Sequence, residues 1–262
     1  MILADLHSHT RASHDGFTGR GEMLLACLNR GVNVIAVTEH DLVCDLDLAE
    51  FKKNGVILVP GCEFTCENGS HIIGIFIKKS LKSGSTRNEI FNHIESQGGI
   101  IIIPHPFKPE SGYFQYYQPD SFLNRVTFLE LINGGWNSID YEESIKKIAL
   151  EYHIKLIASS DSHKIQHVGM CVTRLNCKFP EDENDLKNTF RKIEQGDIEL
   201  LIDDSIDTKY INKNANFKKN TLYQFFLKIT PYKIRRRIKL VKYGFQSKRL
   251  KTQHKYRVYL NE

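Results

Sequence analysis

The sequence predicts an α/β fold in which a parallel β-sheet, covered by helices, closes into a barrel. Strand-like and helix-like segments alternate through residues 1–195. The strand segments are almost continuous apolar runs, which is typical of parallel strands buried on both faces. Several of these runs end in a His, Asp or Glu, and in closed barrels the functional residues gather at those ends. The chain has 262 residues, enough for one large domain and an appendage.

The first predicted strand is the apolar run that begins at Met1 and carries Asp5. His7 and His9 follow directly at its carboxyl end. Side chains two positions apart on a strand point to the same face, so both imidazoles can bind one cation, with Asp5 just before them.

The remaining elements follow in order along the chain. Further strands are expected at 32–37, 56–61, 71–77, 100–103, 128–133, 154–158 and 169–175. Helices are expected at about 18–30, 46–53, 85–97, 139–152 and 181–195. Gly31 suits the position just past the first helix, where a left-handed residue commonly ends it. Roughly seven strand–helix repeats favour a closed barrel over an open sheet.

Residues able to bind metal ions lie at the ends of the predicted strands. They are His7, His9, His40, Glu63, His105, Asp161 and His163. Imidazole and carboxylate ligands without thiolates favour zinc, manganese or iron over a closed structural zinc site. They are too many for one tetrahedral ion and enough for two or three.

Such a cluster is suited to phosphate-ester hydrolysis. Neighbouring divalent ions bind phosphoryl oxygens, offset their charge and lower the pKa of a bound water to about 7. The resulting metal-bound hydroxide then attacks phosphorus in line. The sequence therefore predicts a metal-dependent phosphoesterase.

Short motifs recur along the chain in a fixed order. They are Asp5-Leu6-His7-Ser8-His9-Thr10, Ser13-His14-Asp15-Gly16, Thr38-Glu39-His40-Asp41, Gly61-Cys62-Glu63, His71, Pro104-His105-Pro106 and Ser160-Asp161-Ser162-His163. In this combination they resemble the motifs of the PHP (polymerase and histidinol phosphatase) superfamily, over about residues 1–195. The resemblance implies a distorted seven-stranded (β/α) barrel with a trinuclear metal site.

The resemblance also implies which residues bind each ion. By position, the three sets are His7, His9, Glu63 and Asp161; Glu63, as a bridge, with His71 and His105; and Asp15, His40 and His163. Catalytic roles are expected for Glu63, Asp161 and His163, and the leaving oxygen takes a proton from a site histidine or from water.

Two motifs depart from the family pattern. The segment Ser13-His14-Asp15-Gly16 offers two candidate ligands, and we prefer Asp15 because Gly16 follows it, with His14 as the alternative. Glu39 stands where the family has an aspartate, and its extra methylene displaces any hydrogen bond it makes, so we do not expect it to be a ligand.

Other residues near these motifs have two possible roles. His71 begins its strand, so it is either an ordinary exposed histidine or a ligand, and His105 is either a turn residue or a ligand. Glu130 is expected to be a buried cap or a substrate contact. Arg11 and Lys108 can bind phosphate through charge-assisted hydrogen bonds or be plain surface cations.

The net charge of +5 is unevenly distributed. Residues 213–262 carry fifteen Lys and Arg and one acid, a net +14, whereas residues 1–212 carry 21 basic and 30 acidic residues, a net −9. We therefore expect a catalytic barrel at 1–211, a polar linker at 212–220 and a basic, mainly helical extension at 221–262. Its amphipathic helices are expected to pack on the barrel or a partner subunit, or to bind an anionic membrane surface or nucleic acid.

We expect a cytoplasmic enzyme, peripheral to the inner membrane surface if the extension binds lipid. Asp5, His7 and His9 interrupt what would be a signal-peptide core, and no apolar run is long enough for a membrane span. The six cysteines form no C-x-x-C pair and suit buried positions. The expected substrate is a small phosphorylated metabolite or nucleotide, hydrolysed as a phosphomonoester. The alternatives are a phosphodiesterase or exonuclease, and an interaction module without turnover.

Overall fold

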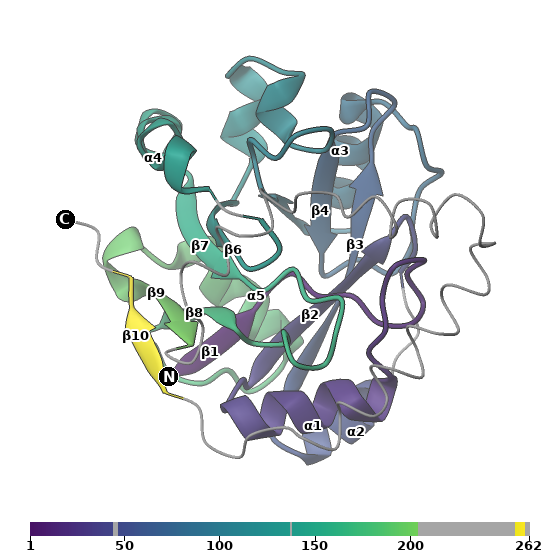
Figure 1. Ribbon diagram of the computed structural model, residues 1–262, viewed down its shortest axis with the longest axis vertical. Coiled ribbons are helices and arrows are strands. Elements are labelled where there is room, and N and C mark those ends of the chain that lie inside the picture. Colours follow the sequence, from purple (N-terminus) through teal and green to yellow (C-terminus); the bar gives the residue numbers. More distant parts are fainter. Residues whose placement is uncertain (44–46, 137, 204–254, 260–262) are drawn as a thin grey trace, which may run out of the picture.

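The computed structural model describes residues 1–43, 47–136, 138–203 and 255–259 (Figure 1). The strands are β1 (Ile2–Asp5), β2 (Val34–His40), β3 (Ile57–Thr65), β4 (His71–Ile75), β5 (Ile100–Ile103), β6 (Phe128–Asn133), β7 (Lys155–Ser159), β8 (Cys171–Leu175), β9 (Ile198–Asp203) and β10 (Tyr256–Val258). The α-helices are α1 (Arg20–Arg30), α2 (Leu48–Lys53), α3 (Arg87–Ser96), α4 (Glu142–Glu151) and α5 (Glu183–Lys192). Short 3-10 turns are η1 (Tyr113–Gln115), η2 (Ser121–Arg125), η3 (Ile139–Tyr141) and η4 (Gln195–Asp197).

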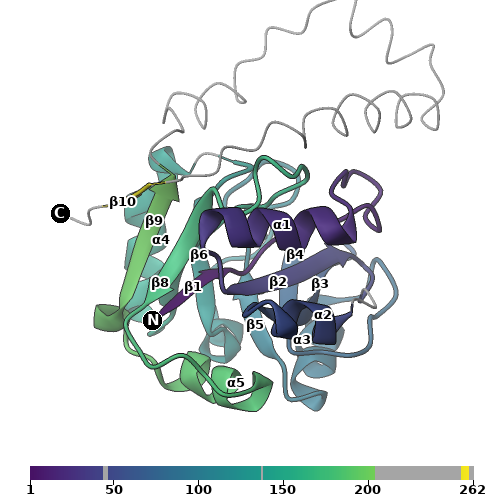
Figure 2. The same ribbon diagram turned by 90° about the horizontal axis from the view of Figure 1, so that it is seen from below.

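The strands of the described residues form one curled sheet with the order β10-β9-β8-β1-β2-β3-β4-β5-β6-β7. This confirms the α/β class, but the described sheet has ten strands rather than seven, and its ladder runs from β10 to β7 without closing. The curl brings β7 close to β8. There the Thr173 hydroxyl accepts a hydrogen bond from the Ala158 amide and donates one to the Ala158 carbonyl, both at 2.9 Å. The sheet is therefore an open half-barrel (Figures 1 and 2).

The expectation of a parallel sheet was wrong for five of the nine strand pairings among the described residues. The strands β1, β2 and β3 are parallel neighbours, as are β5, β6 and β7. In contrast, β4 is antiparallel to β3 and β5, and β8 is antiparallel to β1 and β9. The segment 66–70 between β3 and β4 explains the first reversal, because a parallel crossover needs a dozen or more residues.

Local sequence signals set the ends of the helices. Helix α1 ends at Gly31, which adopts a left-handed conformation with φ of 71°, as predicted from its position after the apolar pattern. Helix α3 begins with a capping box, in which Thr86 and Glu89 satisfy each other's backbone amides. Asp47 caps α2 by accepting hydrogen bonds from two backbone amides.

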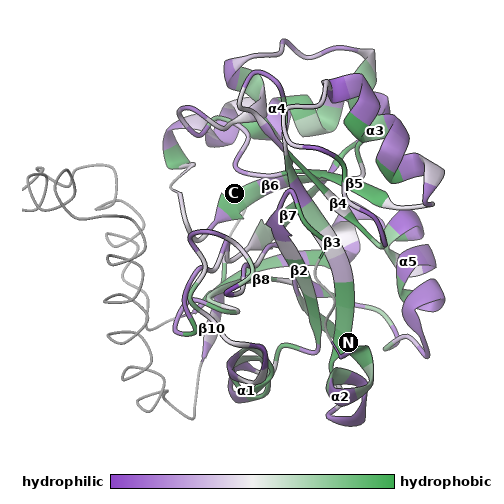
Figure 3. Ribbon diagram, turned by 90° about the vertical axis from the view of Figure 1, so that its right-hand side faces the viewer, coloured by the Kyte–Doolittle hydropathy of each residue, from purple (hydrophilic) through white to green (hydrophobic). Residues whose placement is uncertain are grey.

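Apolar side chains are buried on both faces of the central strands. On β2, Val34 and Ala36 belong to the main core cluster, whereas Ile35 and Val37 belong to a second cluster that packs under α1 and α2. This two-sided burial explains why β2 is a continuous apolar run. Figure 3 shows the same division, with hydrophobic strands inside and the polar faces of the helices outside.

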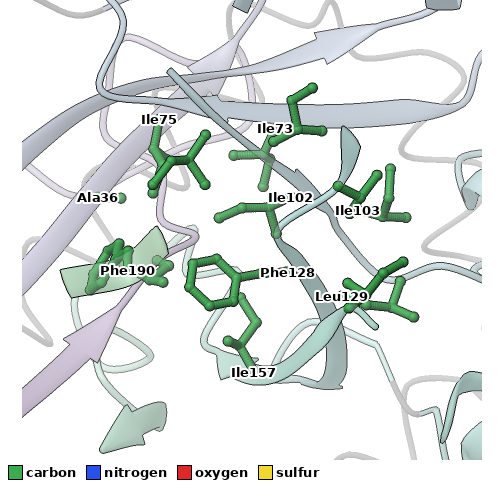
Figure 4. Packing of buried hydrophobic residues seen from close by; sticks show 14 of the residues in the cluster. Ala36, Ile73, Ile75, Ile102, Ile103, Phe128, Leu129, Ile157 and Phe190 are labelled. Carbon is green, nitrogen blue, oxygen red and sulfur yellow. The ribbon is translucent and has the colours of Figure 1, made fainter. Parts of the chain in front are cut away.

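The main cluster fills the space between the strands and helices α3, α4 and α5. Phe128 of β6 lies at its centre, beside Ile102 and Ile157 (Figure 4). The Phe128 ring meets the edge of Phe190 from α5, with 5.6 Å between ring centroids. This packing attaches α5 to the sheet and holds β5, β6 and β7 in place.

The described end of the chain returns to the sheet. Residues 256–258 form β10, antiparallel to β9, although the extension was expected to be mainly helical, and β9 itself was not predicted. The Tyr256 hydroxyl donates a hydrogen bond of 2.7 Å to the Gly169 carbonyl. The linker at 212–220, most of the expected helical extension and the boundary at 211 lie outside the described residues. Within the described ranges, no helix has the length and apolarity that a membrane crossing requires.

We predict that Phe128→Ala lowers the free energy of unfolding by about 3–5 kcal/mol, because the cavity left in the core cannot collapse fully. Leu150→Ala on α4 is the control, since Leu150 is 79% exposed and its truncation should change stability by less than about 0.5 kcal/mol. Urea unfolding followed by circular dichroism measures both. Equal stability of the two variants would contradict the position of Phe128 in the core.

Candidate metal centre

The candidate centre lies at one edge of the sheet, where the carboxyl ends of the parallel strands meet. His7 and His9 directly follow β1, and the His9 amide donates a hydrogen bond of 2.8 Å to the Ser162 carbonyl after β7. His40 ends β2. These backbone positions bring side chains from distant parts of the sequence to one place.

His71 reaches the same edge because its strand runs in the opposite direction. It is the first residue of β4 and pairs with Thr65, near the carboxyl end of the antiparallel neighbour β3. The start of an antiparallel strand lies beside the end of its partner. The apparent anomaly of a polar residue at the beginning of a strand is therefore explained by the β3–β4 hairpin.

The Glu63 carboxylate is the centre of the cluster. Its Oε1 lies 2.7 Å from His71 Nδ1 and 3.0 Å from His105 Nε2. Its Oε2 lies 3.2 Å from His40 Nδ1, 3.3 Å from His9 Nε2 and 3.4 Å from His7 Nε2. One buried carboxylate thus contacts five imidazoles.

Asp161 and Asp15 extend the cluster to two further sides. Asp161 Oδ1 lies 3.4 Å from His7 Nε2 and 3.5 Å from His9 Nε2. Asp15 Oδ2 lies 3.0 Å from His163 Nε2 and 3.5 Å from His40 Nε2. The structure thus brings together all nine residues proposed from the sequence as ligands.

Five overlapping sets of three side chains have potential ligand atoms within 4.8 Å of one another. They are His9, His40 and His163; His7, Glu63 and His105; His7, His9 and Asp161; His14, Asp15 and His40; and His40, Glu63 and His71. Nitrogen and carboxylate donors at this density, with no thiolate among them, fit divalent cations.

The two candidates in the segment after His9 differ in position. The His14 side chain is 68% exposed, and its Nε2 lies 4.0 Å from Asp15 Oδ2. Asp15 instead contacts the imidazoles of His40 and His163. The geometry favours Asp15 over His14 as the deeper group of the pair.

A second set of side chains contacts the ring nitrogens of His7 and His9 that point away from Glu63. Glu130 Oε1 lies 3.0 Å from His7 Nδ1, and its Oε2 accepts hydrogen bonds of 2.8 Å from the His105 amide and the Asn133 side chain. The Ser13 hydroxyl lies 3.2 Å from His9 Nδ1. Such contacts leave the other ring nitrogen to face a metal, the usual arrangement of histidine ligands.

Sequence reasoning anticipated some of these supporting residues and missed others. Glu130 was expected to be buried, and it is, but its contact with His7 was not foreseen. Ser13 was missed, although it stands in the same motif as Asp15. Glu39 accepts hydrogen bonds from the amides of Thr10 and Ser13, at 3.0 and 2.9 Å. It therefore supports the loop and belongs to none of the five ligand sets.

Two residues of the cluster have strained backbones. His105 and Asp161 adopt positive φ angles of 28° and 48°, and neither is glycine. Such conformations cost of order 1–3 kcal/mol each and gather at functional sites. Gly135 passes so close to Asp161 that a Cβ there would lie 2.6 Å from Asp161 Oδ2. The fold therefore holds Asp161 in a backbone conformation that costs conformational free energy.

The charges of the cluster depend on one another. Burial alone would raise the pKa of Glu63, but the imidazoles of His71, His7 and His40 hold that pKa well below its ordinary value. Burial likewise opposes ionisation of Asp161, yet His7 and Lys108 hold its pKa well below the usual range. Burial, reinforced by Lys108, lowers the pKa of His105 to about 4, which leaves its imidazole neutral and able to bind a cation.

An open cavity of about 480 Å³ gives access to the cluster. Its lining includes Glu63, His163 and Lys108. Lys108 Nζ lies 3.5 Å from Asp161 Oδ2. The cavity thus holds a cationic side chain beside the Asp161 carboxylate.

Comparisons with known proteins place these observations in a family. Residues 143–196 match the PHP-associated family. Two uncharacterized proteins of Methanocaldococcus jannaschii are similar to the chain. One is 25% identical over 69% of this chain and 75% of its own length. The other is 30% identical over 41% of this chain and 70% of its own length. A 5′-3′ exoribonuclease of Haemophilus influenzae is 36% identical over 81 residues, 29% of each chain.

Solved structures share the fold at low sequence identity. PsfC from Pseudomonas syringae has a TM-score of 0.59 and 16% identity, over 84% of this chain and 98% of that one. A protein from Bifidobacterium adolescentis described as a metal-dependent phosphoesterase has a TM-score of 0.53 and 14% identity, over 73% of this chain and 96% of that one. The lesion-specific endonuclease EndoQ from Pyrococcus furiosus has a TM-score of 0.52 and 18% identity, over 73% of this chain and 56% of that one. With its ordered motifs, its family match and this shared fold, the chain belongs to the PHP superfamily.

Proposed function

We propose that the protein is a metal-dependent phosphoesterase that acts chiefly on phosphomonoesters. The observation that carries this proposal is the contact of the single buried Glu63 carboxylate with five imidazoles, next to Asp161 and an open cavity. A bridging carboxylate surrounded by nitrogen ligands suits two or three neighbouring divalent ions. Family membership supports the same reaction class, and so does the fold shared with the Bifidobacterium protein, which is described by its assigned class and not by a measured activity.

The nine clustered residues would hold the ions in three groups. The proposed groups, which follow the motif positions and the contacts of Glu63, Asp161 and Asp15, are His7, His9, Glu63 and Asp161; Glu63, His71 and His105; and Asp15, His40 and His163. When bound, divalent ions of this kind offset the charge of phosphoryl oxygens and lower the pKa of water to about 7.

The protein's own groups bind and orient the substrate. Burial would lower the pKa of Lys108, but Asp161 and Glu63 raise it, so the ammonium stays charged and can donate to a phosphoryl oxygen. Glu130 holds the Nδ1 side of His7, so that Nε2 faces Glu63 and Asp161. His163 lines the cavity, where a leaving oxygen could receive a proton from water.

A phosphodiesterase or exonuclease is the second candidate. It is favoured by the 81-residue similarity to a 5′-3′ exoribonuclease and by the fold shared with EndoQ. Release of phosphate from mononucleotides, compared with shortening of labelled single strands by the same preparation, distinguishes the two activities.

We predict that prolonged dialysis against a chelator abolishes hydrolysis and that Mn²⁺ or Zn²⁺ restores it. His7→Ala and Asp161→Ala should each lower kcat/KM by at least about 100-fold, because even losing an outer partner of a metal ligand costs roughly 10- to 100-fold. Phosphate release measures the rate, and elemental analysis measures the metal content.

His153→Asn is the matched control for these histidine substitutions. His153 is exposed, lies away from the cluster and has a φ of 54°, which asparagine tolerates. It should retain full activity and metal content. Full turnover by both His7→Ala and Asp161→Ala would refute the proposed centre.

We further predict that Gly135→Ala lowers activity by on the order of 10-fold, because its Cβ would displace the Asp161 carboxylate. Gly21→Ala is the matched control. A Cβ at Gly21, in the first turn of α1, meets nothing within 4 Å, so alanine there should not destabilise the helix. Parallel measurements of kcat/KM and thermal stability test the pair, and equal activity of the two variants would show that Asp161 needs no such precise position.

A further inference from the structure

We propose that Phe107, Trp136 and Tyr141, the aromatic platform, stack against a nucleobase, so that the substrate is a nucleotide. This inference rests on the proposed function, because it assigns the phosphate of that nucleotide to the metal centre. It adds a binding site for the leaving group, which the metal ligands themselves do not provide.

The three rings lie in series, with Phe107 on the loop after β5, Trp136 after β6 and Tyr141 at the end of η3. Phe114 adjoins Phe107 at one end, with 5.1 Å between ring centroids. The rings of Phe107 and Tyr141 are stacked, with centroids 4.8 Å apart and planes within 4° of parallel. The Trp136 ring continues from Tyr141 at 5.8 Å, tilted by 31°. Because the rings between Phe114 and Trp136 contact one another, a base would stack at the Trp136 end of the series.

Phe107 and Trp136, at the two ends of the aromatic platform, are each next in sequence to a residue that lies close to Asp161. Phe107 immediately precedes Lys108, whose ammonium lies 3.5 Å from Asp161. Trp136 immediately follows Gly135, whose backbone runs so close to Asp161 that a Cβ there would lie 2.6 Å from Asp161 Oδ2. A phosphate held beside Asp161 and Lys108 would therefore leave the rest of the substrate near these rings.

The hydrophobic core does not account for the rings of Trp136 and Tyr141. Phe107 packs partly against the main cluster, but neither Trp136 nor Tyr141 belongs to either cluster or to the side chains packed on them, among the residues described. Tyr141 is 36% exposed and Trp136 is half-buried. Aromatic rings that remain at the surface beside a binding site commonly contact ligands.

Stacking predicts a specific pattern of discrimination. Every nucleobase has an aromatic face, so stacking tolerates different bases, whereas a sugar phosphate without a base gains nothing from it. 5′-AMP and ribose 5-phosphate carry the same reacting phosphoester and differ only in the base. A difference between them therefore reports on the aromatic platform, and the turnover of ribose 5-phosphate reports on the metal centre alone.

The kinetic test compares these two substrates in the full-length protein and its variants. Trp136→Ala and Tyr141→Ala should each raise the KM for 5′-AMP by roughly 10-fold and leave kcat and all constants for ribose 5-phosphate unchanged. Trp136→Phe should restore most of the affinity. Tyr116→Ala removes an exposed aromatic side chain outside the aromatic platform and should change neither substrate.

A binding test is available because Trp136 is the only tryptophan in the sequence. Adenosine, which carries no phosphate, should quench its fluorescence, whereas ribose and inorganic phosphate should not. Unchanged fluorescence with adenosine, together with unchanged KM values in the alanine variants, would overturn the aromatic platform. Quenching by phenyl phosphate but not by adenosine would overturn the nucleobase assignment in favour of another planar group.

The two tests separate this inference from the proposed function. Hydrolysis of ribose 5-phosphate without any preference for 5′-AMP would leave the phosphoesterase intact and reject the aromatic platform. Quenching by adenosine without hydrolysis of any phosphomonoester would support the aromatic platform and reject the phosphomonoesterase.

Discussion

The structure depends on keeping two carboxylates, Glu63 and Asp161, ionised in a buried place. Removing a charged group from water is costly unless opposite charge and hydrogen bonds replace the lost hydration. Here five imidazoles contact Glu63. Lys108 and the imidazole of His163 contact Asp161, as do two of those five, His7 and His9. Those partners come from strands far apart in the sequence, so the sheet must curl enough to bring them together. Divalent ions would balance the same carboxylates while serving the chemistry.

The hydrogen bonds of Asp5 connect this centre to the rest of the fold. Asp5 is fully buried, and burial raises its pKa to about 6, although hydrogen bonds from Ser160 and Gly169 oppose the rise. Its carboxylate accepts from the Ser160 amide and hydroxyl, one residue before Asp161, and from the Gly169 amide. The Gly169 carbonyl in turn accepts from Tyr256 of β10. The last described strand is thus linked by consecutive hydrogen bonds to the segment that positions a proposed metal ligand.

Several features could be read from the sequence because their signals are local. Apolar runs identified eight of the strands, and Gly31 marked the end of α1 correctly. The motif order and the strand-end positions also predicted which side chains would meet. In contrast, β9 was missed, and the direction of β4 was not anticipated, although that direction alone explains why His71 joins the cluster. Strand direction and pairing depend on partners far away in the chain, which no local pattern encodes.

By itself the sequence determined the α/β class, the periodicity of the strands and the set of imidazoles and carboxylates that could bind metal. Only the tertiary structure decided how the sheet curls and which antiparallel strands complete it. It alone also placed Asp15 deeper than His14, and Glu130 behind His7. The physical reason is that side-chain periodicity follows from local backbone geometry, whereas contacts between side chains depend on packing that forms only when the whole chain folds.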